Sequence, residues 1–257
     1  MNKFVYIIRD YFNFFKMSRI IIFSKYILNL KNLTFDFLNN HSRVVLFAMM
    51  SKETLQMFNS SADFSQNPFE MFSKWFEEAK NTKEIHDATA ISLATASGSG
   101  RPSVRMVLLK NFSQDGFTFF TNANSQKGKN LQKNPQAEIN FYWAPLGKQI
   151  RIYGKVSEVS SVESDEYFAS RHIISQMGAC VSRQSSELES YQVLQNEFQA
   201  FQESHKSEDT IIRPPHWKGF RVTPQEFEFW IDGAYRLHLR HKYIIENNIW
   251  KHKLLYP

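Results

Sequence analysis

From residue 88 onward, short segments with the two-residue period of β-strands alternate with turn residues, and this pattern limits the possible folds more than any other. Strands are expected at 90–96, 104–110 and 117–121, with turns at Gly98-Ser99-Gly100 and Gln114-Asp115-Gly116 between them. Seven more are expected at 138–143, 149–158, 219–222, 227–231, 235–240, 242–246 and 248–255. Because β-α-β alternation and a glycine-rich fingerprint are both missing, the sequence predicts an antiparallel α+β barrel.

Helices are expected beside these strands. Asn67-Pro68 precedes apolar residues at helical spacing up to Ala79, so folded structure should begin there. A short helix is predicted over 125–133, another from Ser161 through Arg171, and a longer polar one over 187–206.

The chain divides into two regions by charge. Residues 1–57 hold eight Lys and Arg against three Asp and Glu, so they carry +5 of the formal net charge of +6. We expect a disordered basic extension over 1–57 and one folded domain over 58–257. The domain is then nearly neutral, which argues against nucleic acid as a partner.

Targeting signals are weak in residues 1–57. Charged residues interrupt this region well before the roughly 18 apolar residues of a membrane span, and the same charges break a secretory pattern. We therefore expect a cytoplasmic protein without a membrane partner. The basic, acid-poor composition leaves mitochondrial targeting open as an alternative.

Metal and disulfide chemistry find little support. Cys180 is the only cysteine, which excludes an intramolecular disulfide and any multi-cysteine metal site. The eight histidines show neither HExxH nor His-x-His spacing, so no metal is expected.

Arg236-Leu237-His238-Leu239-Arg240 places two arginines and a histidine at alternate positions. In a strand these three side chains share one face, where they suit an anion or a polar ring. The alternative is a solvated edge strand that basic residues protect from aggregation.

Two further segments offer cations to anions. Arg105 and Lys110 lie at the ends of an apolar strand, on opposite faces, so they would serve different anions; plain strand-end charges are the alternative. Ser125-Gln126-Lys127 begins a helix, where free N–H groups and a lysine suit a phosphate, although a simple helix cap explains the serine equally well.

Two further sets of polar residues are candidates for binding a ligand. Tyr167, Arg171 and Ser175 are spaced four residues apart, so a continuous helix would align them for a phosphate monoester, or simply for solvent. Gln149 and Gln184-Ser185-Ser186 carry amides and hydroxyls that can bind the edge of a heterocycle, or lie on the surface.

In this order the segments strongly resemble the pyridoxamine 5′-phosphate oxidase family, from about residue 67 to residue 257. The matching motifs are Arg-x-x-Leu-Leu-Lys at 105–110, Phe-Phe-Thr-Asn at 119–122, Gln149, Tyr167-Phe168, Ser170-Arg171, Ser175-Gln176-x-Gly178-Ala179, Gln184-Ser185-Ser186, Trp217-x-Gly219, Glu228-Phe229-Trp230 and Arg236-Leu237-His238.

The resemblance implies an FMN-binding split β-barrel homodimer with FMN in clefts between the subunits. It also implies oxidation of pyridoxamine or pyridoxine 5′-phosphate to pyridoxal 5′-phosphate, with O₂ reduced to H₂O₂. The implied cofactor-binding residues are Arg105, Met106, Val107, Leu108, Lys110, Phe120, Thr121, Gln126, Lys127, Gln149, Gln184, Ser185, Trp230 and Arg240. The implied substrate-binding residues are Lys110, Tyr167, Arg171, Ser175, Arg236 and His238, of which Arg236 and His238 are the catalytic pair.

The chain departs from the family pattern at Gln126, His172, Leu239 and Leu254, where arginine, proline, aspartate and arginine are usual. The family's N-terminal arm has no clear match around residues 49–55. Two alternatives therefore stand beside the oxidase: a divergent relative that binds FMN or pyridoxal phosphate with little or no oxidase activity, and a barrel that serves only as an interaction module.

Overall fold

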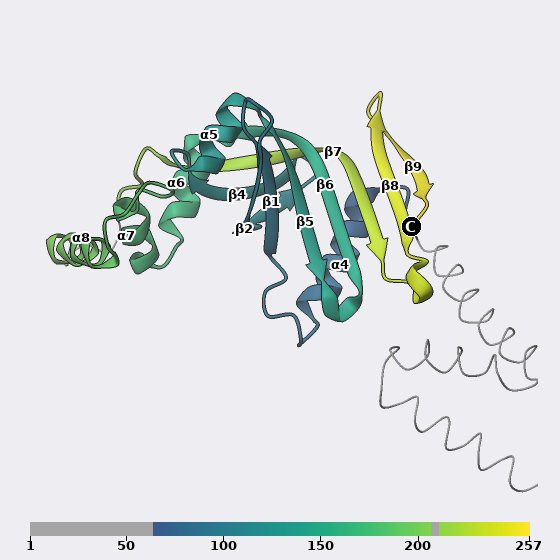
Figure 1. Cartoon of the computed structure of the whole chain (residues 1–257), viewed down its shortest axis with the longest axis horizontal. Helices are drawn as coiled ribbons and strands as arrows, with labels where there is room; N and C mark the ends of the chain where they lie inside the picture. Colours follow the sequence, from purple (N-terminus) through teal and green to yellow (C-terminus); the bar gives the residue numbers. More distant parts are fainter. Residues whose placement is uncertain (1–63, 207–210) are drawn as a thin grey trace, which may run out of the picture. The chain divides into compact units, whose positions relative to one another are not determined.

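One antiparallel sheet dominates the computed structural model, which describes residues 64–206 and 211–257 (Figure 1). Within these residues the strands run in the order β2-β1-β5-β6-β7-β4-β3, and β8 joins β7 to β9. Their bounds are β1 Ala90–Ala96, β2 Pro102–Leu108, β3 Asn111–Ser113, β4 Gly116–Asn122, β5 Gln136–Trp143, β6 Lys148–Glu158, β7 Trp217–Ile231, β8 Leu239–Glu246 and β9 Ile249–Leu255. The helices are α4 Pro68–Lys80, α5 Gln126–Lys133, α6 Ser161–Ala169, α7 Ile173–Val181 and α8 Tyr191–Ser204. The predicted antiparallel α+β architecture is confirmed.

Strand β7 organises the sheet. Its 15 residues pair with β6 along their length, with β4 at the start and with β8 at the end. The sequence predicts two strands here, at 219–222 and 227–231, and that prediction is wrong. Pro224 lies between them, but it falls where the register with β6 shifts at Tyr153/Gly154, so its missing N–H does not end the strand.

Helix α4 closes the main core. Asn67 caps the helix by accepting a hydrogen bond from the N–H of Phe69, as predicted, and Pro68 occupies the first turn. Phe72 is fully buried and meets Phe117 and Phe141 edge to face, with ring centroids 4.8 Å and 5.2 Å apart.

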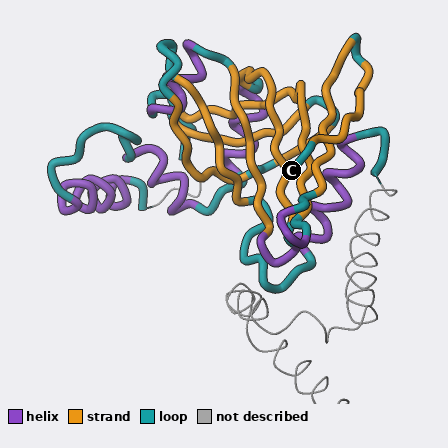
Figure 2. The backbone as a smooth tube through the Cα atoms, turned by 45° about the vertical axis from the view of Figure 1, so that its right-hand side comes forward, coloured by secondary structure: helices purple, strands orange, loops and turns teal. Residues whose placement is uncertain are grey.

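A second, smaller core joins α6 and α7 to the beginning of β7. Its buried members are Phe168, Met177, Ile211 and Trp217. The helices α7 and α8 extend from one end of the sheet (Figure 2), and α8 has no buried residue. The predicted helix over 187–206 starts later, because Ser190 provides the N-cap and Tyr191 the first helical residue.

Two expectations remain, on the N-terminal region and on membrane spans. The predicted extension over 1–57 lies outside the described residues. Among the residues that are described, no helix is long and apolar enough to cross a membrane.

Candidate functional site

A cavity of about 740 Å³ lies between the end of β2, strand β4 and helices α6 and α7. Both predicted groups of binding residues contribute to its wall. The predicted site residues that line it are Met106, Val107, Leu108, Lys110, Phe120, Thr121, Lys127, Tyr167, Arg171, Ser175 and Gln184.

Lys127 forms the centre of one cationic group. Ser125 caps α5 and so places Lys127 at its first turn, where the side chain is 7% exposed. The ammonium donates to Gln184 Oε1 at 2.8 Å, Thr121 Oγ1 at 3.1 Å and Ser125 Oγ at 3.2 Å. All three partners are neutral. Burial, together with the nearby charge of Arg105, lowers the pKa of Lys127 to about 8.

Arg105 completes that group from β2. Its guanidinium donates to Leu93 O and Thr95 Oγ1 at 2.9 Å and to Ser103 Oγ at 2.5 Å. Burial lowers the pKa of Arg105. In the described part of the chain neither Arg105 nor Lys127 has a carboxylate partner. Two adjacent cations without a counter-charge form a suitable seat for an anion such as a phosphate.

A second cationic group lies at α6 and α7. The ring of Tyr167 stacks on Phe120 at 4.2 Å between centroids, and Lys110 Nζ lies 5.9 Å from the Tyr167 ring. Arg171 lies over the Trp217 ring at 5.0 Å, and its buried Nη1 has no hydrogen-bond partner among the described residues. Burial lowers the pKa of Arg171. An unpaired buried guanidinium nitrogen is costly unless a ligand supplies the acceptor.

The turn between the two helices corrects one expectation. A continuous helix through Tyr167, Arg171 and Ser175 is wrong, because α6 ends at Ala169 and α7 begins at Ile173. His172 caps α7 by accepting a hydrogen bond from the N–H of Ile174 on its Nδ1. The three side chains nevertheless line the same cavity, since the tight turn returns the chain to it.

A close approach of backbone and ring shapes the cavity wall. A Cβ atom on Gly219 would lie 2.6 Å from the Phe120 ring, so only glycine fits at this position of β7. The Trp217-x-Gly219 motif thus supplies a ring for Arg171 and space for Phe120. The sequence prediction gave Trp217 no role, although it lines the cavity.

Several predicted site residues lie outside the wall of this cavity. Gln149, Trp230 and Arg240 are cross-strand neighbours on β6, β7 and β8. Arg240 donates to Glu228 Oε1 at 2.8 Å and to the carbonyl of Tyr256. The sequence prediction missed Glu228 as the partner of Arg240, although the spacing of Glu228 and Trp230 places them on one strand face.

The expected alternation of Arg236, His238 and Arg240 on one strand face is wrong. β8 begins only at Leu239. Before it, Tyr235 and Arg236 adopt left-handed conformations with φ of 57° and 65°, and the Arg236 side chain is exposed. The ring of His238 instead packs on Trp230, with centroids 4.7 Å apart, and its Nδ1 lies 3.2 Å from the Asp232 carboxylate. A turn that holds two non-glycine residues at positive φ is strained, as is often found at binding sites.

The remaining predicted residues, Arg105 among them, are not part of the cavity lining. Gln126 is exposed and donates to Asn130 Oδ1 at 2.9 Å, and Asn130 in turn donates to Thr95 Oγ1 beside Arg105. Ser185 has a φ of 72° and lines a neighbouring pocket of about 230 Å³. Leu239 is buried, whereas Leu254 is exposed.

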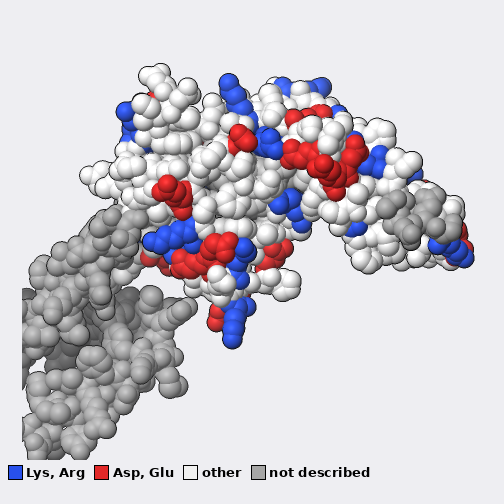
Figure 3. All heavy atoms as spheres, turned by 180° about the vertical axis from the view of Figure 1, so that it is seen from behind, with Lys and Arg blue, Asp and Glu red and all other residues white. Residues whose placement is uncertain are grey.

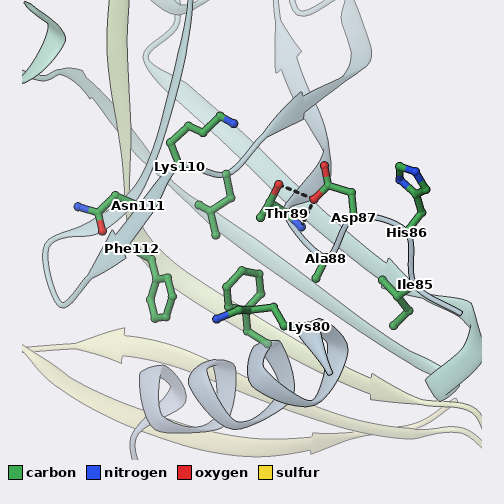
Figure 4. A pocket seen from close by; sticks show the side chains of 11 residues that line it. Lys80, Ile85, His86, Asp87, Ala88, Thr89, Lys110, Asn111 and Phe112 are labelled. Carbon is green, nitrogen blue, oxygen red and sulfur yellow. Dashed lines mark hydrogen bonds between the residues drawn. The ribbon is translucent and has the colours of Figure 1, made fainter. Parts of the chain in front are cut away.

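Another pocket, of about 440 Å³, lies between the end of α4, residues 85–89 and residues 109–112 (Figure 4). Lys110 contributes to it as well as to the first cavity. Asp87 supplies a carboxylate to the lining of this pocket. It accepts hydrogen bonds from the N–H and Oγ1 of Thr89, which lower the Asp87 pKa. Because Thr89 already occupies Oδ1 of this carboxylate, the pocket is a weaker candidate than the first cavity.

Comparison with known proteins gives consistent matches. The family described as pyridoxamine 5′-phosphate oxidase matches residues 77–205, and the family described as pyridoxine 5′-phosphate oxidase C-terminal dimerisation region matches residues 217–257. A pyridoxine/pyridoxamine 5′-phosphate oxidase of Nostoc punctiforme is 46% identical over 199 residues, covering 77% of this chain and 92% of that protein. The corresponding enzyme of Zymomonas mobilis is 43% identical over 75% of this chain and all of that protein.

Solved structures agree. PhzG from Burkholderia lata, crystallised with tetrahydrophenazine-1-carboxylic acid, is 29% identical with a TM-score of 0.72 and covers 76% of this chain and 95% of its own. An FMN-binding protein of Nostoc punctiforme related to pyridoxamine 5′-phosphate oxidase has a TM-score of 0.61 at 18% identity, covering 75% of this chain and 99% of its own; this likeness concerns the fold alone.

Proposed function

The chain belongs to the pyridoxamine 5′-phosphate oxidase family, and from this premise we propose that it oxidises pyridoxamine 5′-phosphate, pyridoxine 5′-phosphate or both to pyridoxal 5′-phosphate. One observation carries the proposal: Lys127 on one side and Lys110 with Arg171 on the other line one cavity, and none of the three forms an ion pair among the described residues. A phosphorylated cofactor and a phosphorylated substrate need two such seats.

The residues present fit FMN. Lys127 and Arg105, with Thr121 and Gln184 beside Lys127, are suited to hold its phosphate and ribityl chain, because two cations and neutral polar side chains lie together there. Bound there, FMN would supply the hydride acceptor for the substrate, with O₂ as the final electron acceptor and H₂O₂ as its product.

The second group is suited to the substrate phosphate. Lys110 and Arg171 supply positive charge, while Tyr167 and Ser175 supply hydroxyl groups at the same wall. The unpartnered Nη1 of Arg171 gains an acceptor when a phosphate binds. The protein thereby fixes the substrate at its phosphate end and leaves the reacting carbon free to approach the flavin.

A homodimer would bring the predicted residues that lie outside the cavity wall to the site. The apolar side chains of Val104, Met106 and Tyr142 are at least 60% exposed on one sheet face, which favours burial against a second copy. The family match over 217–257 is to a dimerisation region. In the proposed dimer, the segment from Trp230 to Arg240 of one subunit completes the cavity of the other.

Arg236 and His238 then act on the pyridine ring. The left-handed turn presents the Arg236 side chain outward, and Trp230 supports the His238 ring. Both side chains would cover the ring and hold it in a geometry suited to hydride transfer. If Arg236→Leu left turnover and substrate affinity unchanged in a peroxide assay, this role would be wrong.

We also propose how the chain as a whole is organised. Residues 58–257 form the oxidase domain and residues 1–57 a basic extension outside it. The protein acts in the cytoplasm, with mitochondrial delivery by the extension as the alternative.

One experiment tests the proposed function directly. Purified protein is examined for visible flavin absorption with and without added FMN, and aldehyde and peroxide formation are followed with each substrate. Flavin with turnover supports the oxidase. Flavin without turnover supports the divergent relative, and loss of both leaves an interaction module.

A further inference from the structure

Gln176 is a buried glutamine of α7 that does not line the cavity and has only 2% of its surface exposed. Its amide nitrogen donates to the carbonyl of Arg171 at 2.7 Å and to that of Ala169 at 3.2 Å. Its amide oxygen accepts from the N–H of Ile211 at 3.1 Å. A buried amide with both ends satisfied is held in one orientation.

The partners of Gln176 determine that orientation. Carbonyl oxygens only accept and a backbone N–H only donates, so the amide nitrogen must face the α6–α7 turn and the oxygen must face Ile211. Reversing the amide would place two acceptors together at Arg171.

The turn depends on this amide because it lies between helices. Arg171 follows the end of α6 at Ala169 and precedes the start of α7 at Ile173, so no helical ladder serves its carbonyl. Among the described residues, the one hydrogen bond given to that carbonyl comes from Gln176.

The same amide also reaches the aromatic support of Arg171. Ile211 begins the segment that leads to Trp217, and the guanidinium of Arg171 lies over the Trp217 ring at 5.0 Å. Arg213, within that segment, donates to the carbonyl of Trp217 at 2.6 Å. Gln176 therefore links the backbone of the arginine to the backbone that leads to the ring beneath it.

We infer that Gln176 is a positioning residue for substrate recognition: by fixing the turn at Arg171 against the segment before Trp217, it aims the guanidinium at the substrate phosphate. The inference rests on the proposed function, which gives that phosphate to Arg171. Gln176 touches neither substrate nor cofactor and acts entirely through Arg171.

The test compares substrates with and without the phosphate. Gln176→Met keeps the length of the side chain and removes its three hydrogen bonds. With the FMN-loaded dimer, kcat/KM for pyridoxamine 5′-phosphate should fall by about 10- to 100-fold, chiefly through KM, because misplacing a binding group by an ångström has effects of this size. The value for unphosphorylated pyridoxamine and the FMN content should change less than about threefold.

The matched control is Gln202→Met, the same substitution at an exposed position of α8. It should leave both kcat/KM values unchanged. If Gln176→Met instead lowers kcat/KM equally for both substrates, Gln176 only stabilises the fold and the inference is overturned.

A second variant covers the case in which Gln176→Met does not fold. In Gln176→Glu the carboxyl retains an acceptor for Ile211 but can donate to the Arg171 carbonyl only when protonated, and burial raises the pKa of such a group. Its preference for the phosphorylated substrate, relative to wild type in the same buffers, should recover as the pH is lowered. A preference that stays constant with pH contradicts the inference.

Equilibrium binding separates this inference from the proposed function. Pyridoxal 5′-phosphate and pyridoxal are titrated against the FMN-loaded wild type and Gln176→Met. A wild type that prefers the phosphorylated ligand but oxidises neither substrate disproves the oxidase, while loss of that preference in the variant still supports the inference. A wild type without any preference overturns the inference.

Discussion

Two regions of the protein treat positive charge in opposite ways. At the cavity, Lys127 and Arg171 contact neutral oxygens or aromatic rings and, among the described residues, no carboxylate. On β6 and β8, Arg151 and Arg240 both pair with Glu228, at 3.3 Å and 2.8 Å. Acidic and basic side chains also lie side by side on the face in Figure 3.

The difference separates binding from structure. A buried cation without a counter-charge lowers stability, so it persists where a ligand needs it. A cation that shares a carboxylate with its neighbours stabilises the sheet instead. The unpaired cations at the cavity are therefore suited to bind phosphate. Arg240, predicted to bind the cofactor, also stabilises the sheet through Glu228.

The largest expected effect is at Arg171. Arg171→Met should lower kcat/KM for pyridoxamine 5′-phosphate by about 100- to 1,000-fold, the loss expected for two charge-assisted hydrogen bonds. The midpoint of thermal unfolding should stay the same or rise, because no carboxylate in the described part of the chain loses a partner. A lower unfolding midpoint with unchanged kinetics would show that Arg171 stabilises the fold and does not bind the substrate.

Lys127 should show the same pattern toward the cofactor. Lys127→Met is expected to raise the Kd for FMN about 100-fold, or about 2–3 kcal/mol. The free energy of unfolding of the apoprotein should not fall, since removal of a desolvated charge offsets the lost hydrogen bonds. Flavin fluorescence titration and denaturant unfolding measure the two quantities.

Arg240 should show the opposite pattern. Arg240→Met leaves Glu228, whose side chain is 11% exposed, with Arg151 alone, so the free energy of unfolding should fall by about 1–3 kcal/mol. Lys242→Met is the matched control: its pair with Glu226 is more exposed and should change stability by less than about 1 kcal/mol. An Arg240 variant with full stability but weak FMN binding would erase the distinction between the two regions.

The smallest effect concerns pH. The pKa of Lys127 is lowered to about 8, and a bound phosphate favours its charged form, so FMN binding takes up a proton. The affinity should fall by about tenfold between pH 7 and pH 9. The same titration on Lys127→Met should show no such fall; an equal fall in both proteins would assign the pH effect to another group.

The sequence predicts most of the sheet because its signals are local. Alternating apolar residues and glycine turns define β1, β5 and β6 within a few residues. The short β3 was missed, since a strand of three residues carries too little pattern. The single long β7 was also missed, because a proline at a bulge has the same sequence signature as a proline that ends a strand.

The sequence indicates candidate site residues better than it indicates their arrangement in space. Cations near turns and helix starts carry a local signal, and the two candidates of this kind, Lys127 and Arg171, both line the cavity. The left-handed turn at Tyr235 and Arg236 carries none, since neither residue is glycine or asparagine and only tertiary contacts impose a positive φ on them. The sequence motif that contains Gln176 indicates no role for its amide, because one of its partners, Ile211, lies 35 residues away.

Strand β7 begins with Trp217 at the cavity and carries Trp230 near its other end. At the rise of a strand, these two residues are separated by on the order of 40 Å along the chain. If each catalytic unit draws its two parts from different subunits, two defective alleles should complement each other. Co-expressed Arg171→Met and Arg236→Leu chains would form hybrid dimers with one fully defective and one fully intact site, restoring about a quarter of normal activity for random pairing.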